Sequence, residues 1–278
     1  ITSSFLGDRL NVNLDVYNAK TIDMLIDRSL PPSSGTTSVK ANLGSQTSNG
    51  IEFSVWGKII RTKDWEWTLS VNGLHSKTTI NNISEAMKRM NEQNATGYTD
   101  GSVSVASSSP LFQYREGESP TAIYAVRSAG IDPATGREIF IKQDGSYTYT
   151  YDTKDQVACG DTNPVMQGSL SSMLQYKNFS LTASFQYRFG GKMYNSTRAL
   201  KVENINPRQN CDVRAFTDRW TKPGDVKPYI DIANATGNTS VYTDRFVEKD
   251  NELWLSSLYL QYNVPVTFLR KIHVQKLY

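Results

Sequence analysis

Runs of alternating apolar and polar residues are joined by connections that are short and long in turn, and this feature constrains the fold most. The short connections are residues 61–64, 177–178 and 265–270, and the long ones, rich in Ser, Thr, Asn, Gly and Asp, are residues 19–49, 77–166 and 190–251. Several long loops without secondary structure are uncommon in a compact domain. They are usual in outer-membrane β-barrels, whose short turns face the periplasm and whose long loops face the outside. The pattern therefore favours such a barrel.

The alternating runs predict about seven antiparallel strands. Clear examples are residues 9–17, 50–58, 65–72, 167–176 and 179–189, and a last pair begins at Trp254, turns at residues 265–270 and re-enters a strand at Lys271. Most runs approach the ~9–11 residues that cross a bilayer as a tilted strand. The first and last strands would both run outward and leave two open edges. We therefore expect the chain to be part of a larger barrel.

The alternation also assigns residues to faces, because successive side chains of a strand point to opposite sides. The residues expected to face lipid are Leu10, Val12, Leu14, Val16, Leu181, Ala183 and Phe185. Those expected to face a wet lumen are Asn11, Asn13, Asp15, Glu66, Thr68, Ser70, Gln186 and Arg188. In the last pair of strands, Trp254 is predicted to share the apolar face with Leu258 and Leu260. Aromatic residues beside the short turns, such as Trp65 and Tyr176, fit the girdles found at membrane interfaces.

Composition excludes several other classes of protein. Hydrophobic residues make up 38% of the 278 residues, below the ~45–50% typical of globular chains, while 15 Tyr and 5 Trp argue against disorder. No stretch approaches the ~20 apolar residues of a membrane helix, which excludes helical membrane proteins. The net charge is +3 and no basic block occurs, so we expect no nucleic acid partner.

Two alternatives to a transport barrel fit the alternation. One is a soluble all-β carbohydrate-binding module, in which the apolar faces of two sheets meet in a core. The other is a small outer-membrane barrel enzyme, which needs a catalytic site in its lumen. The sequence offers no such site: His75 and His273 lack a nucleophile motif, and Asp152, Asp155 and Asp161 lack calcium-loop spacing. We therefore expect no catalytic residues, no metal and no cofactor.

Two sets of loop residues remain as candidates. Tyr147, Tyr149 and Tyr151 alternate in one extended segment, where aromatic faces suit sugar rings, although a half-buried hairpin after the Asp144–Gly145 turn explains the same pattern. Cys159 and Cys211 lie in separate polar segments without a CxxC motif, which argues against zinc. A disulfide between them and a pair of thiols both remain open.

Several segments, in order, resemble the SusC/RagA family of TonB-dependent transporters in Bacteroides-type outer membranes. They are FLGDRL at residues 5–10, NLG at 42–44, NGIE at 49–52, AGIDPATG at 129–136, GDTNP at 160–164, YKNF at 176–179 and RWTKPGD at 219–225. Each motif is weak alone, but their order extends over nearly the whole chain. The chain is thus identified as a C-terminal barrel segment, residues 1–278, of a member of this family.

The resemblance implies an all-β, 22-stranded antiparallel transmembrane barrel with long extracellular loops, located in the outer membrane of a Gram-negative bacterium. It implies a plug and a TonB-contacting region upstream, further strands downstream, and a SusD-like lipoprotein lid over the outer mouth. Function would be TonB-dependent import of oligosaccharides or, in some members, peptides. Arg219, Trp220 and Asp225 would line the outer mouth or touch the lid, although their motif recurs regardless of substrate and favours a structural role in folding the loop.

Overall fold

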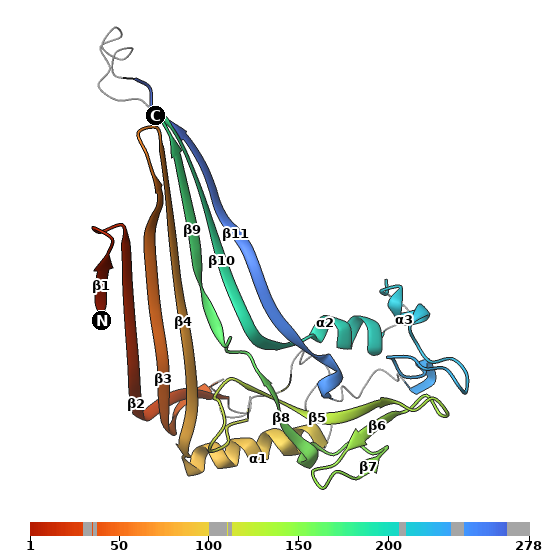
Figure 1. The fold of residues 1–278 in the computed structure, drawn as a ribbon. Coiled ribbons are helices and arrows are strands. Elements are labelled where there is room, and N and C mark those ends of the chain that lie inside the picture. Colours follow the sequence, from red (N-terminus) through yellow and green to blue (C-terminus); the bar gives the residue numbers. More distant parts are fainter. Residues whose placement is uncertain are drawn as a thin grey trace.

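A seven-stranded antiparallel sheet forms the body of the computed structural model (Figure 1), which describes residues 1–29, 35, 38–99, 110, 113–205, 210–234 and 242–265. Its order is β1-β2-β3-β4-β9-β10-β11. The strands are β1 (Thr2–Phe5), β2 (Leu10–Ser29), β3 (Ser38–Arg61), β4 (Trp65–Ile83), β9 (Met166–Tyr176), β10 (Phe179–Tyr194) and β11 (Val247–Tyr262). The predicted strand from Lys271 lies outside the described residues. The antiparallel all-β prediction is confirmed, and β1 is a strand that the alternation did not reveal.

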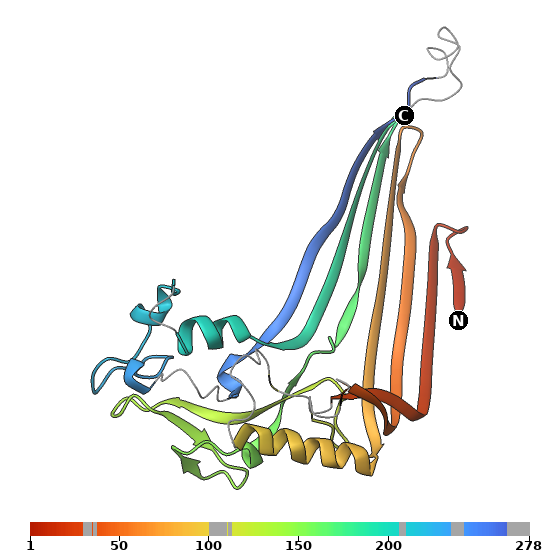
Figure 2. The same ribbon diagram turned by 180° about the vertical axis from the view of Figure 1, so that it is seen from behind.

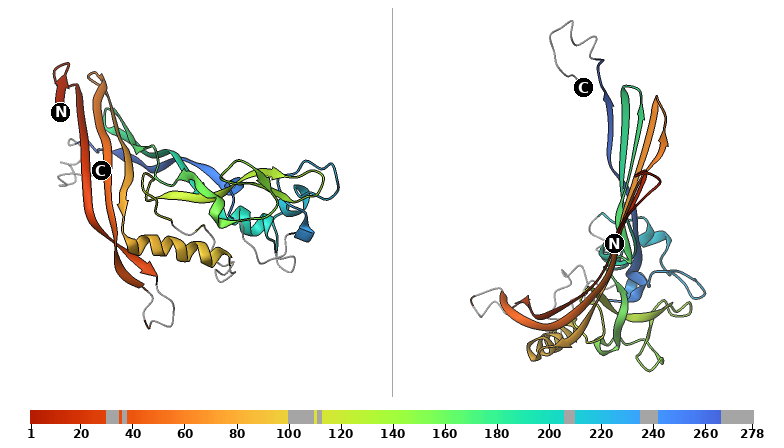
Figure 3. Two further views of the ribbon diagram at one scale, coloured as in Figure 1. Left: turned by 90° about the horizontal axis from the view of Figure 1, so that it is seen from below. Right: turned by 60° about the vertical axis from the view of Figure 1, so that its left-hand side comes forward.

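A second layer lies at one end of this sheet, opposite the tight β3–β4 and β9–β10 turns (Figure 1). It contains the small sheet β7-β6-β5-β8, made of β5 (Ala122–Ile131), β6 (Glu138–Ile141), β7 (Tyr147–Thr148) and β8 (Gln156–Asp161). It also contains α1 (Glu85–Thr99), α2 (Ser196–Arg198) and α3 (Arg214–Thr217). We call the described residues of 84–165 and 195–246 the cap. Figure 3 shows from two further directions that the cap extends away from the sheet's end.

The core of the molecule lies in the cap. Ala199, Val202, Ile205, Ala215, Tyr229 and Phe246 form a buried cluster, with Tyr194 and Cys211 packed against it. A second buried run, Ala122–Val126, is the first half of β5. The long connections are therefore folded around their own apolar core and contain helices and strands, which their polar composition had concealed.

The strands are longer than the alternation predicted. β2 has 20 residues, β3 has 24 and β4 has 19, so they continue into the segments that were expected to be loops. The outer half of β3 carries polar residues on both faces, for example Ser45-Gln46-Thr47-Ser48. Backbone pairing needs no apolar face, so such strands leave no period-two signal.

The register gives the sheet two chemically distinct faces. One row of paired residues reads Leu14–Phe53–Gly73–Gly168–Tyr187–Leu253, and the next reads Asn13–Ser54–Asn72–Ser169–Gln186–Trp254. The seven residues predicted to face lipid lie on the first face, and the eight predicted to face a lumen lie on the second. Which of these faces meets lipid remains a prediction.

Nothing packs over the apolar face within the described part of the chain. Leu181 is 40% exposed, Leu258 64% and Leu260 68%. Seen from both sides (Figures 1 and 2), the middle of the sheet carries no second layer, and the small sheet stays at its end. The described part of the chain therefore does not form the two facing sheets that a soluble sandwich requires. No described helix is long and apolar enough to cross a membrane.

The sequence placed Trp254 on the wrong face. Ser184 pairs with Ser257 and Phe185 with Leu255, so Ser256 is an extra residue that forms a β-bulge. The Ser256 hydroxyl donates to the Ser184 carbonyl oxygen at 2.9 Å. The bulge shifts the phase of β11, so that Leu253 and Leu255 join Leu258 on the apolar face. Trp254 lies on the polar face, opposite Gln186.

Substituting Gly168 by alanine should weaken the pairing of β4 with β9. A Cβ atom at residue 168 would lie 2.0 Å from the Asn72 carbonyl oxygen and 2.7 Å from the Tyr187 hydroxyl. Because backbone cannot yield as a side chain does, we expect a loss of about 1–3 kcal/mol or more in unfolding free energy. Gly57→Ala is the matched control, since its Cβ would meet its nearest atoms at 3.5 Å. Equal urea midpoints for the two variants would contradict this account.

Candidate functional site

The polar face of the long sheet is the first candidate functional surface. Side chains on it bond across the strands: Asn72 Nδ2 donates to Ser169 Oγ at 2.8 Å, and the Ser171 and Ser184 hydroxyls lie 3.2 Å apart. Lys58 Nζ forms an ion pair with Glu66 at 3.0 Å. The face is a continuous set of amides, hydroxyls and mixed charges, and therefore a surface that water or a polar solute can wet.

A pocket of about 360 Å³ opens on this polar face. The pocket is lined by side chains of three strands, β9, β10 and β11: Gln167, Ser169, Gln186, Arg188 and Trp254. Gly168 and Tyr187, which lie between these residues in sequence, complete the lining. Arg188 forms ion pairs with Asp250 and, at 3.5 Å, with Glu252. Of the predicted residues, Gln186 and Arg188 are brought together here. Sequence reasoning missed Trp254 as a member of this site.

The three tyrosines of residues 147–151 do not form one platform. Tyr147 is 70% exposed on β7. The Tyr149 hydroxyl donates to Asp132 at 2.8 Å, and the Arg137 guanidinium lies 4.7 Å from its ring centroid. Tyr151 turns inward against Phe140 and accepts from Gln156, and burial raises its pKa to about 12. The segment is the return of the β6–β7 hairpin, which is the structural alternative that the sequence allowed.

Arg219 is a buried structural residue. It is 3% exposed, and its guanidinium donates to the carbonyl oxygens of Ala215 (2.8 Å), Val202 (2.5 Å), Glu203 (2.7 Å) and Ile230 (2.8 Å). Burial lowers the pKa of this guanidinium from its ordinary value. All three guanidinium nitrogens donate inside the cap, so Arg219 holds the surrounding loop segments together.

Trp220 and Asp225 join two of the sequence motifs. Trp220 is 8% exposed and donates from Nε1 to the Pro133 carbonyl oxygen at 2.9 Å, and its ring leaves no room for a Cβ at Gly136. The Asp225 carboxylate accepts from the Thr221 hydroxyl at 2.7 Å and from two backbone N–H groups. These hydrogen bonds lower the Asp225 pKa. The RWTKPGD and AGIDPATG segments therefore dock on each other.

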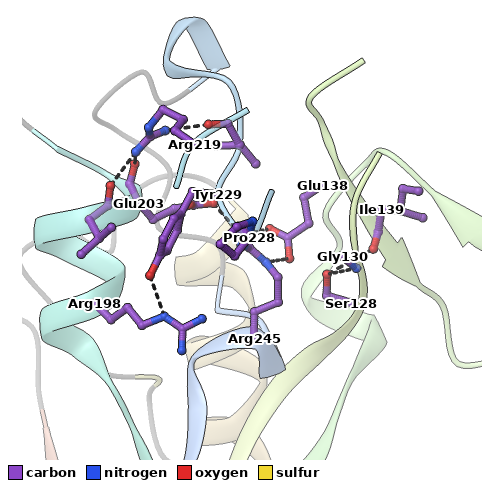
Figure 4. A network of polar contacts seen from close by, with 12 residues as sticks. Ser128, Gly130, Glu138, Ile139, Arg198, Glu203, Arg219, Pro228, Tyr229 and Arg245 are labelled. Atoms are coloured by element: carbon purple, nitrogen blue, oxygen red, sulfur yellow. Dashed lines mark hydrogen bonds and ion pairs between the residues drawn. The ribbon is translucent and has the colours of Figure 1, made fainter. Parts of the chain in front are cut away.

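A buried ion-pair network fastens the cap (Figure 4). Arg245 holds Glu138 with two bonds of 2.7 and 2.8 Å, and also Glu203 at 2.5 Å. The side chains of Glu138 and Glu203 are only 4% and 2% exposed. Burial raises the pKa of Glu203, although Arg245 opposes the shift. The network connects β6, the π-helical turn Ala199–Glu203 and the 3₁₀ turn Asp244–Phe246.

The two cysteines lie in different parts of the cap. Cys159 and Cys211 are both thiols, so the possible disulfide is not formed. Cys159 lies on β8 with Sγ 3.5 Å from the Ala125 carbonyl oxygen, and burial raises its pKa to about 11. Cys211 packs on the core cluster of the cap. No group of three or more Cys, His, Asp or Glu suited to a metal ion occurs among the described residues.

Curated relatives of this chain are TonB-dependent receptors. Receptor P3 of Formosa agariphila is 24% identical over 287 residues, which cover 98% of this chain and 27% of the receptor. SusC of Bacteroides thetaiotaomicron is 26% identical over 201 residues, which cover 68% of this chain and 18% of SusC. The chain thus spans under a third of the length of these relatives. No family model matches it.

Solved structures agree on the fold. The structure of the RagAB peptide transporter matches with a TM-score of 0.72 at 22% identity, over 96% of this chain and 28% of that one. The RagAB importer in its closed-closed state matches with a TM-score of 0.73 at 23% identity. In sequence along nearly its whole length, and in fold, this chain is therefore similar to TonB-dependent receptors of the SusC/RagA type.

Proposed function

We propose that this chain is part of the barrel wall of an outer-membrane importer of nutrient oligomers, energised through TonB. The observation that carries the proposal is the two-faced sheet, apolar and uncovered on one side and polar on the other. An uncovered apolar face is stable against hydrocarbon, and a polar face is stable against water. The apolar face would then meet lipid, and the polar face would line the lumen.

The cap would stand at the outer mouth. It lies at the sheet end opposite the tight turns, which face the periplasm in outer-membrane barrels. A SusD-like lipoprotein is the proposed lid over this mouth, and an upstream region of the same protein would contact TonB. In this arrangement residues 1–278 contribute a C-terminal part of the barrel, and no chemical step is assigned to them.

The substrates proposed are oligosaccharides first and peptides second. The similarity to SusC and to the RagAB peptide transporter supports an importer, but it does not choose between oligosaccharides and peptides. The soluble carbohydrate-binding module is not retained, because its two facing sheets are not formed.

The test is a strain of the source bacterium that lacks the receptor gene. It should lose growth on one class of oligomer while growing normally on the constituent monomers, and the full-length protein should appear in the outer-membrane fraction. Restoring the gene should restore growth. Unchanged growth on every glycan and peptide offered, or release of the protein without detergent, would refute the proposed function.

A further inference from the structure

We infer that the pocket around Trp254 is a subsite for an uncharged sugar unit on the lumenal wall. The inference rests on the proposed import function and assigns one contact within it. Its starting point is the Ser256 bulge, which turns Trp254 from the apolar to the polar face of β11. There Trp254 is 41% exposed and borders an open pocket instead of packing into a core.

The lining of the pocket has the chemistry of a sugar-binding site. An indole face offers a broad apolar surface, and the amides of Gln167 and Gln186 with the Ser169 hydroxyl offer donors and acceptors around it. A pyranose ring has matching parts, with C–H groups on its faces and hydroxyls on its rim. Ligand sites combine apolar surface with a few placed polar groups in the same way.

The charges beside the pocket favour a neutral ligand. Arg188 is the positive group in the lining, and it is engaged by Asp250, which is only 9% exposed, and by Glu252. One guanidinium against two carboxylates leaves no net positive charge to hold a uronate or sulfate. An anionic oligomer would meet these two carboxylates beside the single guanidinium, and like charges repel each other.

The pocket also lies at a depth that suits entry from outside. Phe179 and Tyr262 pair beside the β9–β10 turn, and Trp254 lies eight positions along β11 from Tyr262. At about 3.3 Å per residue the distance along the strand is ~26 Å, and a tilt of about 35–45° makes this ~19–22 Å of the ~25 Å height of the apolar band. The subsite would therefore lie near the outer edge of the membrane, below the cap.

The test uses the purified full-length receptor on an array of neutral, uronic acid-bearing and sulfated oligosaccharides together with a peptide library. We expect the strongest ligands to be neutral oligosaccharides, and Trp254→Ala to weaken their binding about tenfold, the effect of losing an aromatic anchor. Trp254→Phe should restore most of the affinity. Trp56→Ala is the matched control, because Trp56 lies on the same face but on β3, far from the pocket.

Three results would overturn the subsite: strongest binding of anionic glycans or peptides, no binding of any neutral oligosaccharide, or affinities within twofold for Trp254→Ala and wild type. A failure of the proposed function is distinguishable, because it would appear as unchanged growth of the deletion strain. If the deletion strain loses growth on an oligomer while Trp254→Ala binds that oligomer normally, the import function stands and the subsite falls.

Discussion

Arg245→Met should loosen the cap while leaving the long sheet paired. Arg245 is the shared cation of Glu138 and Glu203, and Nη1 also donates to the Pro228 carbonyl oxygen at 2.6 Å. Removing it leaves two buried carboxylates without their counter-charge, a change that typically costs about 3–5 kcal/mol. Hydrogen exchange on the detergent-solubilised receptor should show lost protection in the cap. Protection should be unchanged in the halves of β9 and β10 that adjoin their tight turn.

The controls separate this effect from a general loss of charge. Arg214→Met removes an ion pair with Asp212 that is exposed in the same cap and screened by solvent, so little change is expected. Glu203→Gln should be milder than Arg245→Met, because it keeps an acceptor for Arg245 and removes a carboxylate whose pKa burial already raises. Equal cap protection in Arg245→Met and Arg214→Met would show that the network does not fasten the cap.

The two faces of the sheet could be predicted from the sequence because side-chain alternation is a local property. Asn13 and Leu14 differ by one position, and that alone assigns them to opposite sides. The same argument reached Gln186 and Arg188 correctly as neighbours on one face. It failed at Trp254 because a single extra residue reverses the phase. The signal is visible in hindsight: Leu253 and Leu255 lie out of step with Leu258 and Leu260, with Ser256-Ser257 between them.

The cap could not be predicted in this way, because its contacts join distant parts of the chain. Glu138 and Arg245 are 107 positions apart, and neither local sequence contains a pattern that predicts their ion pair. Arg219 and Asp225 illustrate the same limit in reverse. Their motif is recognisable and polar, as a ligand site would be, yet Arg219 donates to backbone carbonyls within the cap and Asp225 accepts from Thr221 and a neighbouring backbone N–H. The cysteines likewise gave no local sign of whether they meet.

Arginine at Leu181, Ala183 or Phe185 should block insertion of the full-length receptor into the outer membrane. These residues lie on the apolar face of β10 and pair with Leu260, Leu258 and Leu255. Ala183 lies four positions, or about 13 Å of strand, from the aromatic row at Phe179, and hence near mid-bilayer. A charge facing lipid there costs about 2–4 kcal/mol, and less toward either interface. The heat-modifiable, folded fraction in outer-membrane preparations measures the effect.

The neighbouring residues of the same strand supply the control. Thr182 and Ser184 lie between the three apolar residues along β10 but on the polar face, where Ser184 contacts Ser171. Arginine at residue 182 or 184 should therefore insert nearly normally, since its charge would meet water in the lumen. The difference between Ala183→Arg and Ser184→Arg isolates the direction in which the side chain points. If both insert equally well, or if all three lipid-face variants assemble like wild type, the apolar face does not meet lipid.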